Sequence, residues 1–314
     1  MRVIVTGASG FVGRNVLLRA PREWDILALY HHAADLEAFV ARHRLAHVTP
    51  IRCDLVDEAD VHAVAAAVGG RADAALYLAA NSDPTDSATR PRWDLESNAV
   101  ALVNFLQHCP VGHVVFASSG AVYDGLVGDV TPSTPVAPRL PYAISKVASE
   151  QYVRFFAERR HAIDSFVNVR FFGAYGPYES PRKVTTRWMR AVLAGQREFT
   201  VRGNGENLID FMYVDDAADA FLALTTAAGY SGTVDLASHA PVSVNDVVHT
   251  MARVLGVEVS VAHQGHTEEF IQFVSVDRTM RERFGFEPMT SFEDGVRRLH
   301  AHFVREGSSV GQSA

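Results

Sequence analysis

The sequence predicts an α/β fold built around a doubly wound parallel sheet. Short apolar runs rich in valine, leucine and isoleucine alternate with stretches whose apolar residues recur every three or four positions. This alternation is typical of βαβ units, whose right-handed crossovers place helices on both faces of a parallel sheet. With 314 residues, 48% of them hydrophobic, the chain can bury a large core in one or two domains.

Apolar runs predict the strands of this sheet, and helical patterns separate them. In chain order the expected strands are 2–6, 25–30, 47–55, 74–80, 113–119 and 165–172. After about residue 173 the pattern loosens into segments that contain proline and glycine, so we expect a second, smaller lobe there. A run at 210–224 predicts a return to the sheet followed by a helix.

The first expected strand leads into TGASGFVG, which carries three glycines and precedes a helical pattern. Glycines at this spacing let backbone N–H groups approach a pyrophosphate at a helix N-terminus, where the helix dipole favours negative charge. A plain tight turn would also use glycine, but the surrounding alternation of strands and helices favours phosphate binding. The candidate cofactor-binding residues of this loop are Gly7, Gly10, Phe11, Val12 and Gly13.

The composition argues against several classes of function. The net charge of −7 arises from 29 basic and 36 acidic residues without a basic stripe, so we do not expect nucleic acid as a partner. No segment reaches the roughly 18 apolar residues of a membrane span, and the N-terminus enters a strand without a signal-like leader. Cys53 and Cys109 match no disulfide or metal framework and the histidines are scattered, so we expect a cytoplasmic protein without a metal site.

Tyr142 and Lys146 are four residues apart and therefore lie on one face of an expected helix. Ser119 ends the expected strand 113–119, at the sheet edge where ligands of such folds bind. Moving a phenol pKa from near 10 to near 7 requires about 4 kcal/mol of phenolate stabilisation, much of which a nearby ammonium can supply. Tyr142 would then move a proton as a nicotinamide moves a hydride. Lys146 could also hold the cofactor ribose, and Ser119 a substrate oxygen.

These motifs resemble those of the extended short-chain dehydrogenase/reductases, and within them the NAD-dependent epimerase/dehydratase family that acts on nucleotide sugars. TGASGFVG is similar to the family's TGxxGFxG loop, SSGAVY to its serine segment and YAISK to its YxxxK signature. VRFFGAYGP is similar to RxxNVYGP, and IDFMYVDDAADA to RDFxYVxDxxxA. CDL at 53–55 resembles the adenine-contacting segment and LYLAA at 76–80 the fourth strand. The resemblance covers residues 1 to about 300.

The resemblance implies a Rossmann domain that binds NAD or NADP, a nucleotide sugar as small-molecule substrate, and Ser119, Tyr142 and Lys146 as catalytic residues. Besides the glycine loop, Tyr142 and Lys146, the implied cofactor contacts are Tyr30, Asp54, Leu55, Leu78, Ala79 and Ala80. We further expect a homodimer. The expected division is a dinucleotide-binding domain at 1–172 with a return segment near 209–237, a substrate lobe at 173–208 and 238–305, and a flexible tail at 306–314.

One departure from the family pattern bears on the reaction. Family dehydratases and decarboxylases carry an acidic residue just after the catalytic hydroxyl residue, whereas here Gly120 and Ala121 follow Ser119. Dehydration and decarboxylation are therefore disfavoured. Oxidation of a carbinol and reduction of a ketone remain.

A second departure concerns the cofactor. The family often ends its second strand with an acid that binds the adenosine ribose, but this chain has Tyr30 and His31 there, and Arg14 follows the glycine loop. Loss of the acid removes a repulsion against a 2′-phosphate, which makes NADP as well as NAD a candidate. Alternatively, Tyr30 stacks near the adenine and backbone groups hold the ribose.

A third departure concerns the substrate. The arginine of RDF is replaced by Ile209 and the asparagine of RxxN by Gly173. A diphosphate still needs charge-assisted partners, for which the second lobe offers basic residues that could equally be solvated surface groups. These are Arg182, Lys183, Arg187 and Arg202. The full set of candidate substrate-binding residues is Asn81, Ser119, Gly120, Tyr142, Gly173, Arg182, Arg187 and Arg202.

The sequence therefore supports two enzymatic hypotheses. The first is an NAD(P)-dependent nucleotide-sugar epimerase that acts at C4 through a transient 4-keto sugar. The second is an NADPH-dependent ketoreductase of a 4-keto sugar or a smaller carbonyl compound. A non-catalytic dinucleotide-binding protein is a third hypothesis, against which the joint presence of Ser119, Tyr142 and Lys146 argues.

Overall fold

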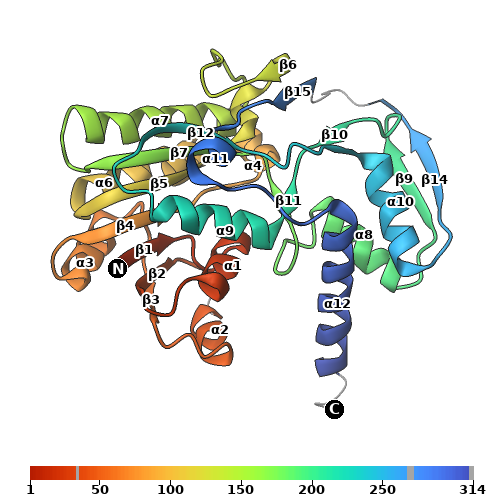
Figure 1. The fold of residues 1–314 in the computed structure, drawn as a ribbon, viewed down its shortest axis with the longest axis horizontal. Coiled ribbons are helices and arrows are strands. Elements are labelled where there is room, and N and C mark those ends of the chain that lie inside the picture. Colours follow the sequence, from red (N-terminus) through yellow and green to blue (C-terminus); the bar gives the residue numbers. More distant parts are fainter. Residues whose placement is uncertain (33–34, 267–271, 311–314) are drawn as a thin grey trace.

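The computed structural model of the chain describes residues 1–32, 35–266 and 272–310. At its centre lies a seven-stranded sheet with the order β12-β7-β5-β4-β1-β2-β3, in which all neighbours are parallel (Figure 1). Its strands are β1 (Arg2–Thr6), β2 (Asp25–Tyr30), β3 (Val48–Arg52), β4 (Ala72–Tyr77), β5 (Val111–Ser119), β7 (Ser165–Phe171) and β12 (Ser231–Leu236). The expected doubly wound parallel sheet is thus confirmed.

Helices cover both faces of this sheet. Successive residues of a strand point to opposite faces, and here the residues on both faces are apolar and need to be covered. Val3 and Val5 of β1 belong to one core cluster, whereas Ile4 between them belongs to a second. The first cluster includes residues of α1 (Phe11–Arg19), α2 (Leu36–Arg42), α9 (Val214–Thr225) and α11 (Thr279–Phe284). The second includes residues of α3 (Glu58–Val68), α6 (Ala101–His108) and α7 (Pro141–Glu158).

A separate hydrophobic cluster lies in the part of the molecule at the right of Figure 1. It is built from α8 (Val184–Leu193), α10 (Val244–Leu255), α12 (Phe292–Val310) and the parallel pair β9 (Glu198–Arg202) and β14 (Ser260–Gln264). Three further short pairs are β8 (Ala174–Tyr175) with β11 (Met212–Tyr213), β10 (Leu208–Ile209) with β13 (Val242–Ser243), and β6 (Val127–Val130) with β15 (Gln272–Ser275).

Short helical segments follow the carboxyl ends of β4 and β5. They are α4 (Pro84–Thr89), α5 (Pro91–Leu95), the π-helix η1 (Glu96–Val100), which continues into α6, and the 3₁₀-helix η2 (Gly120–Tyr123). The sequence pattern did not separate α4, α5 and η1. Within the described residues, no helix combines the length and the apolar composition that crossing a bilayer requires.

Two expectations about the chain's course need correction. The segment near 210–214 does not rejoin the main sheet, because α9 begins at Val214 and leaves β11 only two residues, which pair with β8. The strand that returns to the main sheet is β12, at the edge beside β7. Residues 306–310, expected in a flexible tail, are the end of α12. Residues 311–314 of that tail lie outside the described part of the chain.

Candidate active site

The glycine loop between β1 and α1 is closely packed at the positions that lack side chains. Gly7 has φ +65°, and a Cβ on it would lie 2.8 Å from the backbone nitrogen of Ala79. A Cβ on Gly13 would lie 2.4 Å from the carbonyl oxygen of Gly7, so α1 can approach the loop only with glycine there. Gly10 precedes α1 without a capping side chain, and the first turn of α1 has no acidic residue. Its N–H groups therefore suit an anion.

Thr6 fixes the loop after β4 to the glycine loop. Its buried hydroxyl accepts hydrogen bonds from the backbone N–H groups of Leu78 and Ala79, each at 3.1 Å. Because these two N–H groups are occupied, contacts of Leu78 and Ala79 with a cofactor would use side chains or carbonyl groups. Sequence reasoning missed Thr6, since a threonine in a β-branched run is an ordinary strand residue.

A carboxylate from α2 lies beside the end of β2, which the sequence pattern did not show. The Tyr30 hydroxyl donates a hydrogen bond to Glu37 of α2 at 3.0 Å, and this bond raises the pKa of Tyr30. His31 lies 3.5 Å from the carboxylate of Asp54, also an expected cofactor residue. Leu55 is buried in the core cluster beside α3 and α6, so its side chain packs inside the protein. An acid is therefore present near the expected ribose site, supplied by a helix instead of the strand.

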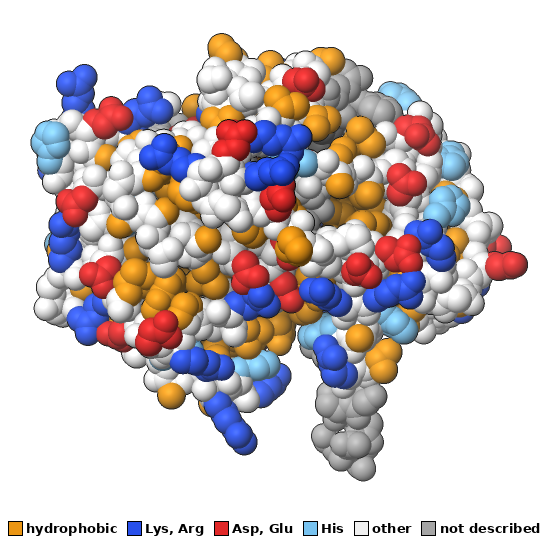
Figure 2. Space-filling model, viewed as in Figure 1, with side chains coloured by type: hydrophobic (Ala, Val, Ile, Leu, Met, Phe, Trp, Pro, Cys, Tyr) orange, Lys and Arg blue, Asp and Glu red, His pale blue; other side chains and the backbone are white. Residues whose placement is uncertain are grey.

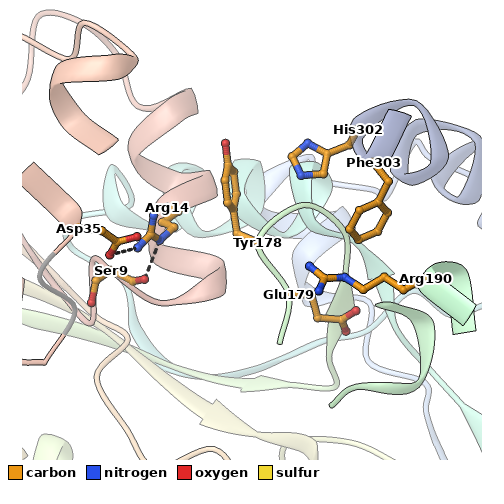
Figure 3. A pocket seen from close by; sticks show the side chains of 8 residues that line it. All are labelled: Ser9, Arg14, Asp35, Tyr178, Glu179, Arg190, His302 and Phe303. Atoms are coloured by element: carbon orange, nitrogen blue, oxygen red, sulfur yellow. Dashed lines mark hydrogen bonds and ion pairs between the residues drawn. The ribbon is translucent and has the colours of Figure 1, made fainter. Parts of the chain in front are cut away.

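Arg14 forms a second charged group on this side of the glycine loop (Figure 3). Its guanidinium donates hydrogen bonds to the Ser9 carbonyl (2.8 Å) and to Asp35 (2.7 Å), and lies over the ring of Phe39 at 4.9 Å. A cavity of about 350 Å³ extends from these residues to Tyr178 and to the side chains of α8 and α12. The molecular surface is notched where α2 and α12 stand apart (Figure 2).

Ser119, Tyr142 and Lys146 come together at the carboxyl edge of the sheet. Ser119 ends β5 and its hydroxyl accepts a hydrogen bond from the Ala121 N–H at 3.1 Å, while Tyr142 and Lys146 lie in the first two turns of α7. The Lys146 ammonium donates to the Ala117 carbonyl at 2.8 Å and lies 5.9 Å from the centre of the Tyr142 ring. The spacing in the sequence thus places the phenol and the ammonium on one helical face, as expected.

Burial sets the protonation of this group. It raises the pKa of the Tyr142 phenol, and a hydrogen bond with Ser119 opposes the rise. It lowers the pKa of Lys146 to about 8, against the negative charges of Asp94 and Glu150. Lys146 therefore still carries its proton at neutral pH, where the charge can stabilise a phenolate.

The expected substrate-binding residues lie in different environments. Asn81 is buried and its amide is used internally, because Nδ2 donates to Asp94 (2.8 Å) and Oδ1 accepts from the Asp83 N–H (3.0 Å). Gly120 packs on Phe172, whose ring a Cβ would approach to 3.0 Å.

The other expected substrate residues lie on the side of the smaller lobe. Gly173 follows β7 with φ +140°, a conformation that favours glycine. Arg182 is exposed, 3.8 Å from the carboxylate of Asp83, at the carboxyl edge of β4. Arg187 and Arg202 are exposed on α8 and β9, two elements of the separate hydrophobic cluster. Arg182 therefore lies beside a loop of the main sheet.

A buried charge network that sequence reasoning missed joins the carboxyl ends of β5, β7 and β12. Arg170 binds Glu150 through two hydrogen bonds (3.1 and 2.9 Å) and donates to the Tyr123 hydroxyl at 3.0 Å. Tyr123 in turn donates to Asp235 at 2.8 Å, and the Ser118 hydroxyl donates to Glu150. Residues of these types at scattered positions give no periodic signal. Among the described residues, no cluster of three or more potential metal ligands occurs.

The chain's residues fit a dinucleotide. Any Cβ at Gly7 or Gly13 would fill the space that the glycine loop leaves open. The N-terminus of α1 suits a pyrophosphate. The fold and this site define a Rossmann-type enzyme that uses a nicotinamide dinucleotide and has a serine, a tyrosine and a lysine at the carboxyl edge of its sheet. The chain belongs to the NAD dependent epimerase/dehydratase family, whose model matches residues 3–236. The expected family, enzyme class and cofactor are thereby confirmed.

Relatives of the chain include both dehydratases and epimerases. It is 25% identical to a dTDP-glucose 4,6-dehydratase of Escherichia coli, over 99% of this chain and 98% of that protein. It is 26% identical to a UDP-glucose 4-epimerase of Mycolicibacterium smegmatis, over 94% of this chain and 96% of that one. Among solved structures, MoeE5 in complex with UDP-glucose and NAD superposes with a TM-score of 0.84 at 25% identity, covering 98% of this chain and 99% of MoeE5.

A UDP-N-acetylglucosamine 4-epimerase from Methanobrevibacter ruminantium M1 shares the fold at 23% identity. Its TM-score is 0.86, with 97% of this chain and 98% of that chain covered. Membership of the nucleotide-sugar epimerase/dehydratase group is therefore clear, and the reaction has to be argued from the site.

Proposed function

We propose that the protein is a nucleotide-sugar 4-epimerase that works through a transient 4-keto sugar. The observation that carries this proposal is the group of Ser119, Tyr142 and Lys146 without a carboxylate beside Ser119. A 4,6-elimination needs an additional acid or base next to the ketone. Gly120 has no side chain, and a Cβ there would lie 3.0 Å from the Phe172 ring, which would have to shift. Ala121 carries only a methyl group, and its N–H donates to Ser119.

Each member of this group has a role in the proposed reaction. Tyr142 takes the proton of the substrate's C4 hydroxyl as that carbon is oxidised, and returns it when the carbonyl is reduced from the other face. Ser119 donates a hydrogen bond to the same oxygen, and the Lys146 ammonium stabilises the phenolate. NAD, when bound, supplies a hydride acceptor that becomes a donor in the second half of the cycle. The glycine loop and α1 would hold its pyrophosphate.

The experiment that tests the proposal uses protein as purified, without added cofactor. UDP- and dTDP-linked hexoses are incubated with it, and the sugars are separated by stereochemistry. An epimerase retains its cofactor and interconverts a C4 pair. Formation of a 4-keto-6-deoxy product, or no conversion of any sugar nucleotide, would contradict the proposal.

A second candidate is an NADPH-dependent ketoreductase of a 4-keto sugar or a smaller carbonyl compound. The observation that favours it is Ile209 in β10, which stands at the arginine position of the family pattern RDFxYVxDxxxA. A reductase has to exchange its cofactor at each turnover. Steady consumption of added NADPH with 4-keto substrates, and no epimerisation, would select this alternative.

We also propose that the chain forms a homodimer in the cytoplasm. Exposed apolar side chains gather on neighbouring elements α5, η1 and α7: Trp93, Leu95, Val100, Ile144, Tyr152 and Phe155. Such a group of aromatic and aliphatic side chains suits association with a second copy.

Cys53 and Cys109 are buried free thiols, as a reducing compartment allows. The division into a cofactor domain and a substrate lobe at the boundaries given above is part of the same proposal.

A further inference from the structure

Asp94 is a fully buried carboxylate that packs beside α7. Its Oδ1 accepts hydrogen bonds from the side-chain amides of Asn81 (2.8 Å) and Asn98 (3.0 Å), and its Oδ2 accepts one from the Ser145 hydroxyl (2.7 Å). These three donors are neutral. A carboxylate can accept all of them, whereas a carboxylic acid would bring its own proton into a cage of donors. The cage therefore suits a negative charge.

The Lys146 ammonium is the buried positive charge near this cage. It is 3% exposed, donates one hydrogen bond to the Ala117 carbonyl and lies 5.0 Å from the centre of the Phe116 ring. A carbonyl and a ring face do not neutralise a charge, so the ammonium needs a negative group to keep its proton in this environment. Burial lowers the pKa of Lys146, and the charges of Asp94 and Glu150 both oppose that change.

Of these two carboxylates, Glu150 is already balanced. Arg170 binds both of its oxygens, and the two side chains form a buried ion pair. The positive charge of Arg170 cancels most of the field of Glu150 at a distance. Asp94, whose partners are neutral, has no such cancellation. Its charge is therefore the one that Lys146 experiences most fully.

We propose that Asp94 is a positioning residue whose buried negative charge keeps Lys146 protonated and whose bond to Ser145 holds the turn of α7 between Tyr142 and Lys146. Its part in catalysis rests on the proposed function, because it acts only through those two side chains. The Ser145 hydroxyl links the carboxylate to the helix segment that carries both of them.

The other groups around Lys146 supply less of this charge, because Arg170 balances Glu150 and the described partners of Lys146 on β5 are uncharged. From α7 come Tyr142 and Glu150, from β7 Arg170, and from β5 only the uncharged Phe116 and the Ala117 carbonyl. Burial raises the pKa of Tyr142, and Asp94 raises it further. The charge of Asp94 thus favours the protonated forms of both Tyr142 and Lys146 before substrate and cofactor bind. Without this charge, Lys146 should lose its proton at a lower pH.

The chain is suited to a direct test because it contains two lysines, Lys146 and Lys183. Protein grown with isotope-labelled lysine gives one NMR signal from the buried Lys146 and one from the exposed Lys183, which serves as an internal reference. In Asp94→Asn we expect Lys146 to titrate at a pH lower by about one unit, with Lys183 unchanged. The matched control is Asp86→Asn on α4, a half-buried carboxylate that pairs with Arg90. An unchanged Lys146 titration in Asp94→Asn would overturn the proposal.

Asparagine has the shape of Asp94 and can keep its hydrogen bonds to Asn81, Asn98 and Ser145. Its Oδ1 keeps the bonds from Asn81 and Asn98, and its new amide can donate to Ser145, whose hydroxyl can turn to the Tyr142 carbonyl at 2.9 Å. Ser145→Ala makes the complementary change, since it keeps the charge and removes the link to α7. We expect Lys146 of Ser145→Ala to titrate within about 0.3 pH units of the wild type; a shift as large as in Asp94→Asn would contradict a role of the charge.

If Asp94→Asn does not fold, the urea midpoints of Lys146→Met and of the double variant Asp94→Asn/Lys146→Met replace the titration. Without the ammonium the buried carboxylate lacks its counter-charge, so the double variant should be at least as stable as Lys146→Met. A clearly lower midpoint for the double variant would overturn the proposal.

In the pH profile of kcat/KM, the fall at high pH should shift to lower pH in Asp94→Asn and stay in place in Ser145→Ala. A purely structural role of Asp94 would not produce this difference between the two variants. An unmoved limb in Asp94→Asn would count against the role of its charge. The lysine titration needs no substrate, so its outcome stands whether or not epimerisation is found.

Discussion

The phenol of Tyr142 is the single group whose loss should affect the proposed reaction most. Tyr142→Phe removes the proton carrier and leaves the ring and the cofactor cradle in place. We expect turnover to fall by a factor of about 10² to 10⁴, with NAD affinity nearly unchanged. Turnover with the preferred sugar nucleotide and fluorescence titration with NADH measure the two effects. Tyr230→Phe, a tyrosine outside this site just before β12, is the control; equal activity of both variants would remove Tyr142 from the mechanism.

Asp235 links the stability of the fold to pH. Burial raises its pKa to about 7, with Asp277 acting in the same direction, and hydrogen bonds from Ser275 and Tyr123 together with Arg170 opposing. Because this carboxyl keeps its proton in the folded protein above the pH at which the unfolded chain releases it, its contribution to stability is lost as pH rises from about 4 to about 7.

Asp235→Asn should therefore flatten the pH dependence of stability. Between pH 5 and 7 we expect the wild-type free energy of unfolding to fall, relative to the variant, by up to about 1.4 kcal/mol per pH unit. Urea denaturation at several pH values measures both curves. Parallel curves would show that Asp235 is ionised throughout this range.

Asp35 and Arg14 form an ion pair beside the glycine loop. Asp35→Asn removes a negative charge from the side of Arg14 and frees its guanidinium for a 2′-phosphate. Since the Asp35 side chain is 66% exposed, we expect NADP(H) affinity to rise only about three- to tenfold, with NAD(H) affinity unchanged. Calorimetric titration with both cofactors measures this. Asp25→Asn, at the opposite end of β2, is the control; an equal gain for both cofactors would place the ribose elsewhere.

At the level of elements, the strands of the main sheet that form buried apolar runs could be predicted from the sequence. The edge strand β12 could not, because SGTVDL is half polar and pairs with β7, which lies more than 60 residues earlier in the chain. Two-residue strands such as β11 carry no period at all. The spacing of Tyr142 and Lys146 predicts that they share a helical face, which the structure shows. The buried position of Asp94 could not be predicted, because a carboxylate on a helix usually marks a solvated face.

The junction of β1 and α1 depends on the lack of a side chain at Gly13. A Cβ there would collide with the Gly7 carbonyl, and valine would push α1 away from the loop. We therefore expect Gly13→Val to abolish NAD(H) binding, which fluorescence titration can measure. Ala66→Val, an exposed position on α3, controls for a β-branched residue in a helix. Unchanged affinity in Gly13→Val would mean that the loop is only a turn.

For the molecule as a whole, the exposed apolar side chains of α5, η1 and α7 predict association. Light scattering after gel filtration should give the mass of two chains for the wild type. Phe155→Asp places a charge among these side chains and should yield single chains. Val127→Asp, an exposed position on β6, should leave the dimer intact. A wild type of one-chain mass at micromolar concentration would refute the proposed dimer.

The two sides of α7 have a consequence for how the enzyme would respond to dilution. One side buries Tyr142 and Lys146, and the other exposes Ile144, Tyr152 and Phe155. A helix moves as a rigid unit. Contacts on the outer face of α7 therefore also restrict the motion of the Tyr142 phenol on its inner face. In a dimer of the proposed kind each copy would brace the proton-transfer helix of the other, and specific activity per chain would fall as the concentration drops below the dissociation constant of the pair.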